Sequence, residues 1–341
     1  MGMSDQDIPI FSWRGVRREF TRYLPAWFLY ASAIGLLHEL LANFPDEGFA
    51  ALGIPRTAFV PTVLFPLAWV ALFFGLRIRR STRLRHPWRA WLALAAMVVA
   101  VPLAVIYLHR PYRLTCAQLA LWFEISQFVW VALLAIQVLI TRGRHGLVLF
   151  FGVTFAYGVL LENCGIVMGY FFEPDFHVYL RPLPAPLCTM VGWCLIFYVT
   201  VAIVGQLAGW VPWLARGVGC RALAATLLAL CVDAQLDPLA SMSGVFWRWN
   251  ELLPPAFLGV PAINYAAWLG AFLPFAWFVF AFLDRADLPP GRRNWEIFLR
   301  VPLASVLGAA LCFAVMAIVE GGFDGATFRI LGLFVQRLVP Y

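Results

Sequence analysis

The sequence predicts an all-α fold, a polytopic membrane bundle of eight to nine transmembrane helices in one domain. Hydrophobic residues make up 62% of the 341 residues and charged residues only 13%, about half the charged fraction of a soluble domain. The apolar residues form runs of about 20, the length at which a helix crosses the hydrocarbon core of a bilayer. The arginines concentrate in short segments between these runs. Together these three observations predict an integral membrane protein.

Nine apolar runs are long enough to cross a membrane. In chain order they lie near residues 24–42, 58–76, 90–108, 117–140, 146–172, 186–208, 219–240, 261–283 and 299–320. The sequence has no obvious internal repeat. No linker between the runs is long enough to separate two domains. We therefore expect residues 1–341 to form a single polytopic domain.

The two ends of the chain differ from the spans. Residues 1–23 predict a cytoplasmic N-terminal segment, and 24–320 the transmembrane bundle. The tripeptide at 31–33, Ala-Ser-Ala, resembles a signal-peptidase site, but the apolar run continues to Ala42, which favours an uncleaved span. Residues 321–341, ending FRILGLFVQRLVPY, predict an interfacial amphipathic helix or a short extra span.

The distribution of arginine predicts the orientation. Arginines cluster before the first span and in the loops after the second, fourth, sixth and eighth spans, whereas alternate loops hold acids such as Asp46, Glu47, Glu173 and Asp175. Because cytoplasmic loops carry the excess of basic residues, the N-terminus is predicted to be cytoplasmic, in a multi-pass protein of the cytoplasmic membrane. The net charge of +7 is explained by this topology, and we expect no nucleic-acid partner.

Polar residues inside the spans gather in one half of the membrane. They are Glu39, Glu124, Glu162, Asn163, Asp233, Asp237 and Asn264. Tolerance of acids near helix ends would explain Glu39 and Asp237, but it explains Glu162 less well. Ionisable residues inside a membrane face protein or water rather than lipid and are functional candidates by default. The pattern predicts one polar cavity that opens toward the outer side.

The fifth span has the most informative local pattern. In YGVLLENCGIVMGY, Gly158, Glu162, Gly165 and Gly169 fall on one stripe of a helix. Glycines allow another helix backbone to approach closely. Packing alone would explain the glycines, but a carboxyl group within the stripe predicts that Glu162 points into a helix interface.

Asp233 and Asp237 are i, i+4 neighbours on the seventh span. Two carboxyl groups in a site of low dielectric constant cannot both ionise cheaply, so one is expected to keep its proton near neutral pH. Pro238 follows directly, and proline disfavours helix at the residue before it. We therefore expect the helix to break at Asp237, which would then lie on an irregular turn lining a cavity.

Aromatic residues follow the aspartates. Trp247 and Trp249 flank Arg248, and tryptophans near a membrane surface are either anchors or, alternatively, a wall whose π faces stabilise a cation. At similar depth lie Trp193, Tyr265 and Trp268.

Four blocks of the sequence resemble the integral-membrane carotenoid hydratases, the family of bisanhydrobacterioruberin hydratase and the bacterial γ-carotene hydratases. The blocks, in order, are ENCGIVMGYFFE (162–173), PLCTMVGW (186–193), DAQLDPLASMSGVFWRWN (233–250) and GVPAINYAAW (259–268). They cover about a quarter of the chain, and the first 140 residues share with the family only their apolar character. The resemblance implies acid-catalysed addition of water to a terminal isoprenoid double bond of a carotenoid or related polyprenoid.

That chemistry needs a protonated carboxylic acid in a dry site, a stabilised tertiary carbocation and a water activated by a base. We expect Asp237 or Asp233 to be the acid and Glu162 the base, although these two roles could be exchanged. Asn264 would orient the water, and the tryptophans would line the cavity. The expected substrate-binding residues are Trp193, Trp247, Trp249, Asn264, Tyr265, Trp268, Asn163, Glu124 and Glu39.

No cofactor or metal is expected. The seven cysteines are scattered and the five histidines dispersed, without the spacing of a zinc site. The expected partners are a lipophilic polyene or isoprenoid substrate and the lipid bilayer.

Two other functions compete with hydration. A protonation-initiated isoprenoid or terpene cyclase would make the same cation and capture it with an internal double bond. A proton-coupled transporter of a lipophilic substrate would also carry intramembrane carboxyl groups. Against the transporter, the sequence has no internal repeat, and its carboxyl groups cluster in one half of the membrane.

Overall fold

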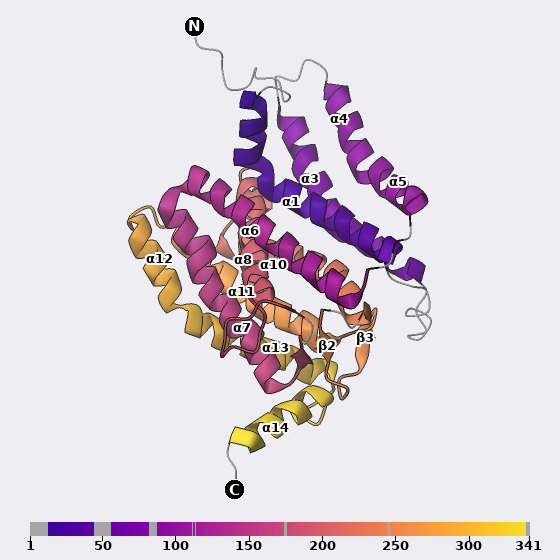
Figure 1. Ribbon diagram of the computed structural model, residues 1–341. Helices are drawn as coiled ribbons and strands as arrows, with labels where there is room; N and C mark the ends of the chain where they lie inside the picture. The colour runs from indigo at the N-terminus through magenta and orange to yellow at the C-terminus, as the bar shows by residue number, and fades with distance from the viewer. Residues whose placement is uncertain are drawn as a thin grey trace.

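Helices make up nearly all of the regular structure in the computed structural model (Figure 1), which describes residues 13–43, 56–81, 87–110, 112, 114–173, 176–243 and 246–338. The α-helices are α1 (Trp13–Asn43), α3 (Leu64–Arg80), α4 (Pro87–Ala95), α5 (Val101–Leu108), α6 (Cys116–Leu147), α7 (Thr154–Met168), α8 (Leu187–Ala208), α9 (Pro212–Ala215), α10 (Val218–Ser243), α11 (Ala262–Leu283), α12 (Pro290–Leu299), α13 (Val301–Val319) and α14 (Ala326–Leu338). Short 3-10 or π segments are η1 (Arg56–Ala58), η2 (Val60–Val63), η3 (Ala96–Ala100) and η4 (Val148–Val153).

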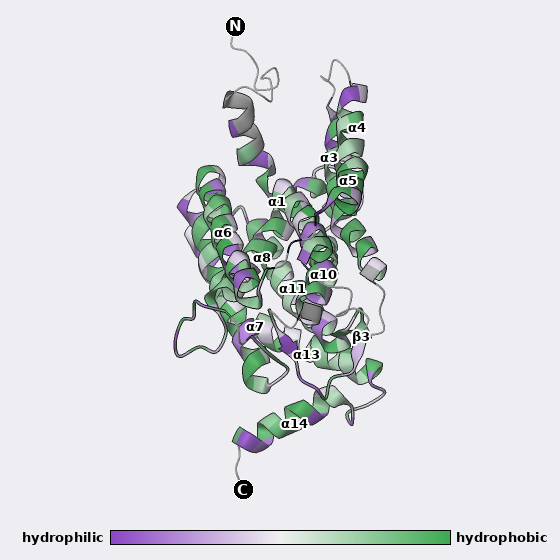
Figure 2. Ribbon diagram, turned by 45° about the vertical axis from the view of Figure 1, so that its right-hand side comes forward, coloured by the Kyte–Doolittle hydropathy of each residue, from purple (hydrophilic) through white to green (hydrophobic). Residues whose placement is uncertain are grey.

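Eight helical segments of the described chain are long and apolar enough to cross a membrane. One of them, Cys116–Met168, has 53 residues and contains two helices, because Gly143 takes a non-helical conformation (φ 67°, ψ −170°) between them. The nine expected spans therefore correspond to these segments, and the predicted polytopic all-α bundle is confirmed. The hydropathy colouring shows the apolar character of the helices (Figure 2).

Two expectations about helix boundaries were wrong. α10 does not break at Asp237 but continues through Pro238 to Ser243, because any other backbone conformation would leave more peptide groups unpaired in apolar surroundings. α7 ends at Met168 rather than near 172, because Gly169 adopts a left-handed conformation (φ 86°) and caps the helix.

The only regular structure outside the helices, in the part of the chain that the structure describes, is two small antiparallel ladders. Strand β1 (Phe171–Phe172) pairs with β2 (Arg248–Trp249), and β3 (Pro255–Phe257) pairs with β4 (Val260–Pro261). The first ladder joins the loop after α7 to the loop after α10, which brings two of the sequence blocks together.

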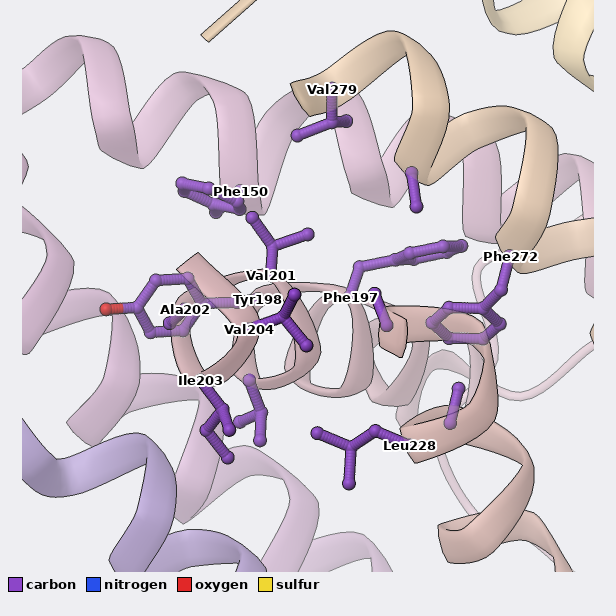
Figure 3. Close-up of a cluster of buried hydrophobic side chains, with 14 of the residues drawn as sticks. Phe150, Phe197, Tyr198, Val201, Ala202, Ile203, Val204, Leu228, Phe272 and Val279 are labelled. Carbon is purple, nitrogen blue, oxygen red and sulfur yellow. The ribbon is translucent and has the colours of Figure 1, made fainter. Parts of the chain in front are cut away.

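Helix α8 lies at the centre of the bundle and contacts α1, α6, α7, α10 and α11. Its Phe197 points toward Phe272, with ring centroids 4.2 Å apart, and its Tyr198 points the other way, toward Phe150 (Figure 3). These aromatic contacts fill the core of the bundle around α8.

A buried glutamine compensates for the proline in α1. Pro25 has no N–H to bond the carbonyl of Thr21, four residues earlier. Gln137 of α6 donates its Nε2–H to that carbonyl at 2.7 Å, and the Tyr198 hydroxyl donates to Gln137 Oε1. These two hydrogen bonds tie α1, α6 and α8 together one turn before the proline.

The last helix, α14, lies across the end of the bundle away from the N-terminus (Figures 1 and 2). Glu320, at the end of α13, accepts hydrogen bonds from the backbone N–H of Thr327 at 3.1 Å and from its hydroxyl at 2.9 Å. A helix is thus present where the sequence predicts an interfacial one. Its position in a bilayer, like the cytoplasmic N-terminus, stays a prediction.

Helices α11 and α13 cross in backbone contact at Gly270 and Gly308, and a Cβ atom on either glycine would overlap the other's carbonyl. We expect Gly308→Ala to lower the free energy of unfolding by about 1–3 kcal/mol, the usual cost of overpacking, measured as a lower melting temperature in detergent. Gly205→Ala is the matched control, because nothing lies within 4 Å of the Cβ it would add. Equal melting temperatures for the two variants would contradict the tight crossing.

Candidate functional site

A cavity of about 910 Å³ lies among α1, α6, α7, α8, α10, α11 and α13. This volume is at the upper end of the range for small-molecule sites. Its walls are mainly aliphatic and aromatic, and the few polar groups that line it include the carboxyl groups of Glu39, Glu162 and Asp237. The cavity is therefore suited to an apolar ligand with one polar or reactive point.

The polar wall of the cavity lies near one end of its helices. Glu162 and Asp237 each lie six residues before the last residue of their helix, Met168 and Ser243, or about 9 Å at the helical rise of 1.5 Å per residue. Asn264 lies in the first turn of α11. These three residues thus lie near the helix ends that the sequence predicts, whereas their common depth in a bilayer stays a prediction.

The aspartate pair has one member at the cavity and one behind it. Asp237 lines the cavity, whereas Asp233 is fully buried and does not line it. Asn264 donates its Nδ2–H to Asp233, at 3.1 Å from both carboxyl oxygens. The two carboxyl groups also interact with each other, and Asp237 is the member of the pair in contact with the cavity.

Glu162 also lines the cavity, and the indole N–H of Trp193 donates to its Oε2. This contact depends on Gly158, where an added Cβ would lie 2.8 Å from both the carbonyl oxygen of Met190 and the Cβ of Trp193. The predicted close approach at Gly158 is present, and it brings α7 against α8 so that the carboxyl group meets the indole.

Glu173 is a site residue that the sequence reasoning missed and assigned to an outer loop. It follows the end of α7, and its loop folds back so that its side chain is buried beside Glu162. Thr189 Oγ1 lies 3.2 Å from Glu173 Oε2. Burial raises the pKa of Glu173 well above its usual range, and the charge of Glu162 raises that pKa further. The feature of the sequence that could have indicated a role for Glu173 is its place at the end of the block ENCGIVMGYFFE.

The site therefore contains two carboxyl pairs with the same arrangement. Glu162 and Asp237 line the cavity, and Glu173 and Asp233 lie behind them. None of the four takes part in an ion pair with a described residue. In the same part of the chain no group of three or more His, Cys, Asp or Glu side chains is arranged to hold a metal ion.

Stacked indole and phenyl rings form the wall next to Glu162. The ring centroids of Trp193 and Trp268 are 4.8 Å apart, and those of Trp268 and Phe272 are 5.5 Å apart and nearly parallel. Trp247 and Trp249 also line the cavity, and Trp249 donates its indole N–H to Ser241 at 2.6 Å. The expected tryptophans thus meet at one cavity.

Three expected substrate-binding residues do not line the cavity. Glu124 accepts hydrogen bonds from the backbone N–H groups of His177 and Val178, at 2.9 and 3.0 Å. Asn163 accepts one from Ala185 N–H at 3.1 Å. Both side chains therefore hydrogen-bond to the backbone of the loop between α7 and α8.

The third of these residues is Tyr265, whose hydroxyl lies 3.5 Å from the carbonyl of Phe257, a residue of β3. Glu39, by contrast, lines the cavity together with Tyr112, whose hydroxyl donates to Glu39 at 2.8 Å. Asn264 also lines the cavity, and its Nδ2–H donates to Asp233, so its expected role in orienting a water stays a prediction.

Comparison with protein families gives one match, to the family described as carotenoid biosynthesis protein, over residues 122–335. The matched range includes all four carboxyl groups of the two pairs and the tryptophans of the cavity. Neither the curated proteins nor the solved structures contain a match to the chain.

The loop that carries Glu173 depends on Glu124, which accepts from two backbone N–H groups and the His177 ring. We expect Glu124→Ala to speed hydrogen exchange at the amides of His177 and Val178 at least tenfold, because both lose their acceptor. Exchange measured by mass spectrometry in detergent checks this. Glu296→Ala, on α12, should leave that exchange unchanged. Unaltered protection in the Glu124 variant would show that other contacts hold the loop.

Proposed function

Because the chain belongs to the carotenoid biosynthesis protein family, we propose that it adds water to a terminal isoprenoid double bond of a carotenoid or related polyprenoid. One observation carries the proposal: Glu162 and Asp237 face the same apolar, tryptophan-lined cavity, and each is backed by a second carboxyl group. An acid and a base for such a reaction are thus available at one site, and the other walls of that site are mainly apolar.

In the proposed reaction Asp237 is the acid, because Asp233 does not reach the cavity. The Asp237 proton forms a C–H bond as the π bond breaks, which leaves a tertiary carbocation on the more substituted carbon. Water attacks that carbon, and Glu162 takes the proton that the water releases. One water is added, and the proton gained by Glu162 replaces the one given up by Asp237.

The surroundings favour a cation in the cavity. The rings of Trp193 and Trp268, tilted to each other with centroids 4.8 Å apart, both line the cavity, and the π faces of indole rings attract positive charge. The carboxylate of Glu162 would add a full negative charge at short range, in a medium where few dipoles screen it. The same surroundings would suit a cyclase, in which an internal double bond instead of water captures the cation.

A lipophilic substrate explains the placement of the enzyme. A cavity with mainly apolar walls inside a membrane bundle would take a polyene from the bilayer rather than from water. A proton-coupled transporter fits less well, because the carboxyl groups cluster near one end of the helices instead of following a path across the bundle.

The test is expression in a host that makes acyclic carotenoids, followed by mass spectrometry of the extracted pigments. We expect a product heavier by one water, and a loss of at least 100-fold in its formation by Asp237→Asn and by Glu162→Gln, because each change removes a proton-transfer group.

The matched controls are Asp287→Asn and Glu296→Gln, which make the same chemical changes at ion pairs with Arg285 and Arg292 away from the cavity. A product of unchanged mass with a different elution time would indicate cyclisation instead. Unaltered pigments with several acyclic substrates, from well-folded protein, would overturn the proposal.

The Trp193 indole N–H is expected to hold Glu162 in its reactive orientation. Trp193→Phe keeps an aromatic wall but removes this donor, and hydrogen bonds to charged groups contribute about 1.5–3 kcal/mol. We therefore expect product formation to fall about 10- to 150-fold, measured as initial rate in membranes. Trp295→Phe, an exposed tryptophan of α12, is the control. Equal rates for both variants would remove Trp193 from the mechanism.

A further inference from the structure

The carboxyl group of Glu173 has too few hydrogen-bond donors for a buried anion. Within the described part of the chain its Oε1 is fully buried and has no hydrogen-bond partner. Its Oε2 faces only the Thr189 hydroxyl at 3.2 Å. That hydroxyl has one hydrogen and also lies 3.0 Å from the carbonyl of Pro186, so it cannot satisfy both acceptors at once. An ionised carboxylate in this position would carry a large desolvation cost.

The neighbouring carboxyl group of Glu162 is also buried, but it lines the cavity and has a hydrogen-bond donor. It receives the indole N–H of Trp193, a group that can only donate, and this contact favours the ionised form. Glu162 and Glu173 are close enough to hydrogen-bond to each other. A hydrogen bond between two carboxyl groups requires that one of them keep its proton. A proton on Glu173 would turn its unpaired oxygen into a donor.

We propose that Glu173 is neutral near physiological pH and donates its carboxyl proton to Glu162, so that the pair holds one proton and Glu162 faces the cavity as the anion. Glu173 is thus a positioning residue that acts through Glu162. Its role in catalysis rests on the proposed hydratase function, whereas the sharing of the proton does not.

The charges around Glu173 support this assignment. The titratable groups that face it are Glu162 from α7, Asp237 from α10, Cys188 from α8 and Tyr179 from its own loop. None of them is a cation that would stabilise a second carboxylate. The pKa of Glu173 is raised by burial first and by the charge of Glu162 second, in agreement with a neutral group.

The loop from Gly169 to Pro186 is built to hold Glu173 in place. The Tyr179 hydroxyl donates to the backbone carbonyl of Glu173 at 2.7 Å, and Phe171 pairs with Trp249 in the β1–β2 ladder. Glu124 and Asn163 anchor the same loop further along the chain, at His177, Val178 and Ala185. Such placement is what a carboxyl donor needs to meet one oxygen of its partner.

The sharing of the proton has a use in the proposed reaction. A neutral donor at Glu173 fixes the orientation of the Glu162 carboxylate before water arrives. When Glu162 takes a proton from the attacking water, both members of this pair are neutral, and the one negative charge of the site has moved to Asp237, which gave its proton to the substrate. The pair then returns to one proton as the acid is restored.

Infrared spectroscopy of the purified protein in detergent tests the protonation directly. Protonated carboxyl groups have a carbonyl stretching band separate from that of carboxylates, and we expect the wild-type minus Glu173→Gln difference spectrum to show the loss of one such band. Glu296→Gln, which removes a carboxylate paired with Arg292 and Arg300, should leave the band in place. An unchanged band in Glu173→Gln overturns the proposal.

Two variants separate the positioning role from simple packing. Glu173→Gln keeps a donor for Glu162, whereas Glu173→Met keeps the length of the side chain without a donor. We expect the Gln variant to form product at least tenfold faster than the Met variant when both have similar melting temperatures. Equal rates overturn the positioning role. If the wild type hydrates no substrate, the hydratase proposal fails, and the infrared band still decides whether Glu173 is neutral.

Discussion

Four carboxyl groups buried in an apolar bundle impose the constraint on which this site depends. No cation of the described chain forms an ion pair with them, so each needs donated hydrogen bonds or a proton of its own. The protein meets this need with an amide from α11, an indole N–H from α8 and a second carboxyl group behind each one that lines the cavity. Helices from distant parts of the sequence must therefore meet at one place, and the cavity is the space that they leave.

Hydrogen bonding of polar groups and close backbone packing also determine contacts elsewhere in the bundle. At Pro25 of α1, a glutamine from α6 takes over a carbonyl that the helix cannot satisfy. At Gly270 and Gly308, two helices approach so closely that no side chain fits between their backbones. In the absence of water, contacts of this kind rather than the hydrophobic effect select which helices become neighbours.

Much of the fold followed from the sequence because a bilayer leaves few choices. A run of about 20 apolar residues has to be a helix, and the ends of consecutive helices alternate between membrane faces, which placed Glu162, Asp237 and Asn264 at one depth. The helix break predicted at Pro238 was wrong because, in apolar surroundings, a proline inside a helix costs less free energy than unwinding the helix.

The remaining errors concern loops. Periodicity predicts the face of a helix on which a side chain lies, but not which loop covers that face. Glu173 looked like an ordinary loop acid, although Gly169 reverses the chain and returns it to the cavity. Glu124 and Asn163 looked like ligand-binding residues, although their partners are backbone amides of that same loop.

The β1–β2 ladder bears on how the protein is made. Its partners, Phe171 and Trp249, are separated by two complete transmembrane helices, α8 and α10. During synthesis the loop after α7 therefore leaves the ribosome well before the strand that pairs with it. The pairing of the two strands, which fixes the start of the loop that carries Glu173, can therefore form only after both α8 and α10 have been translated.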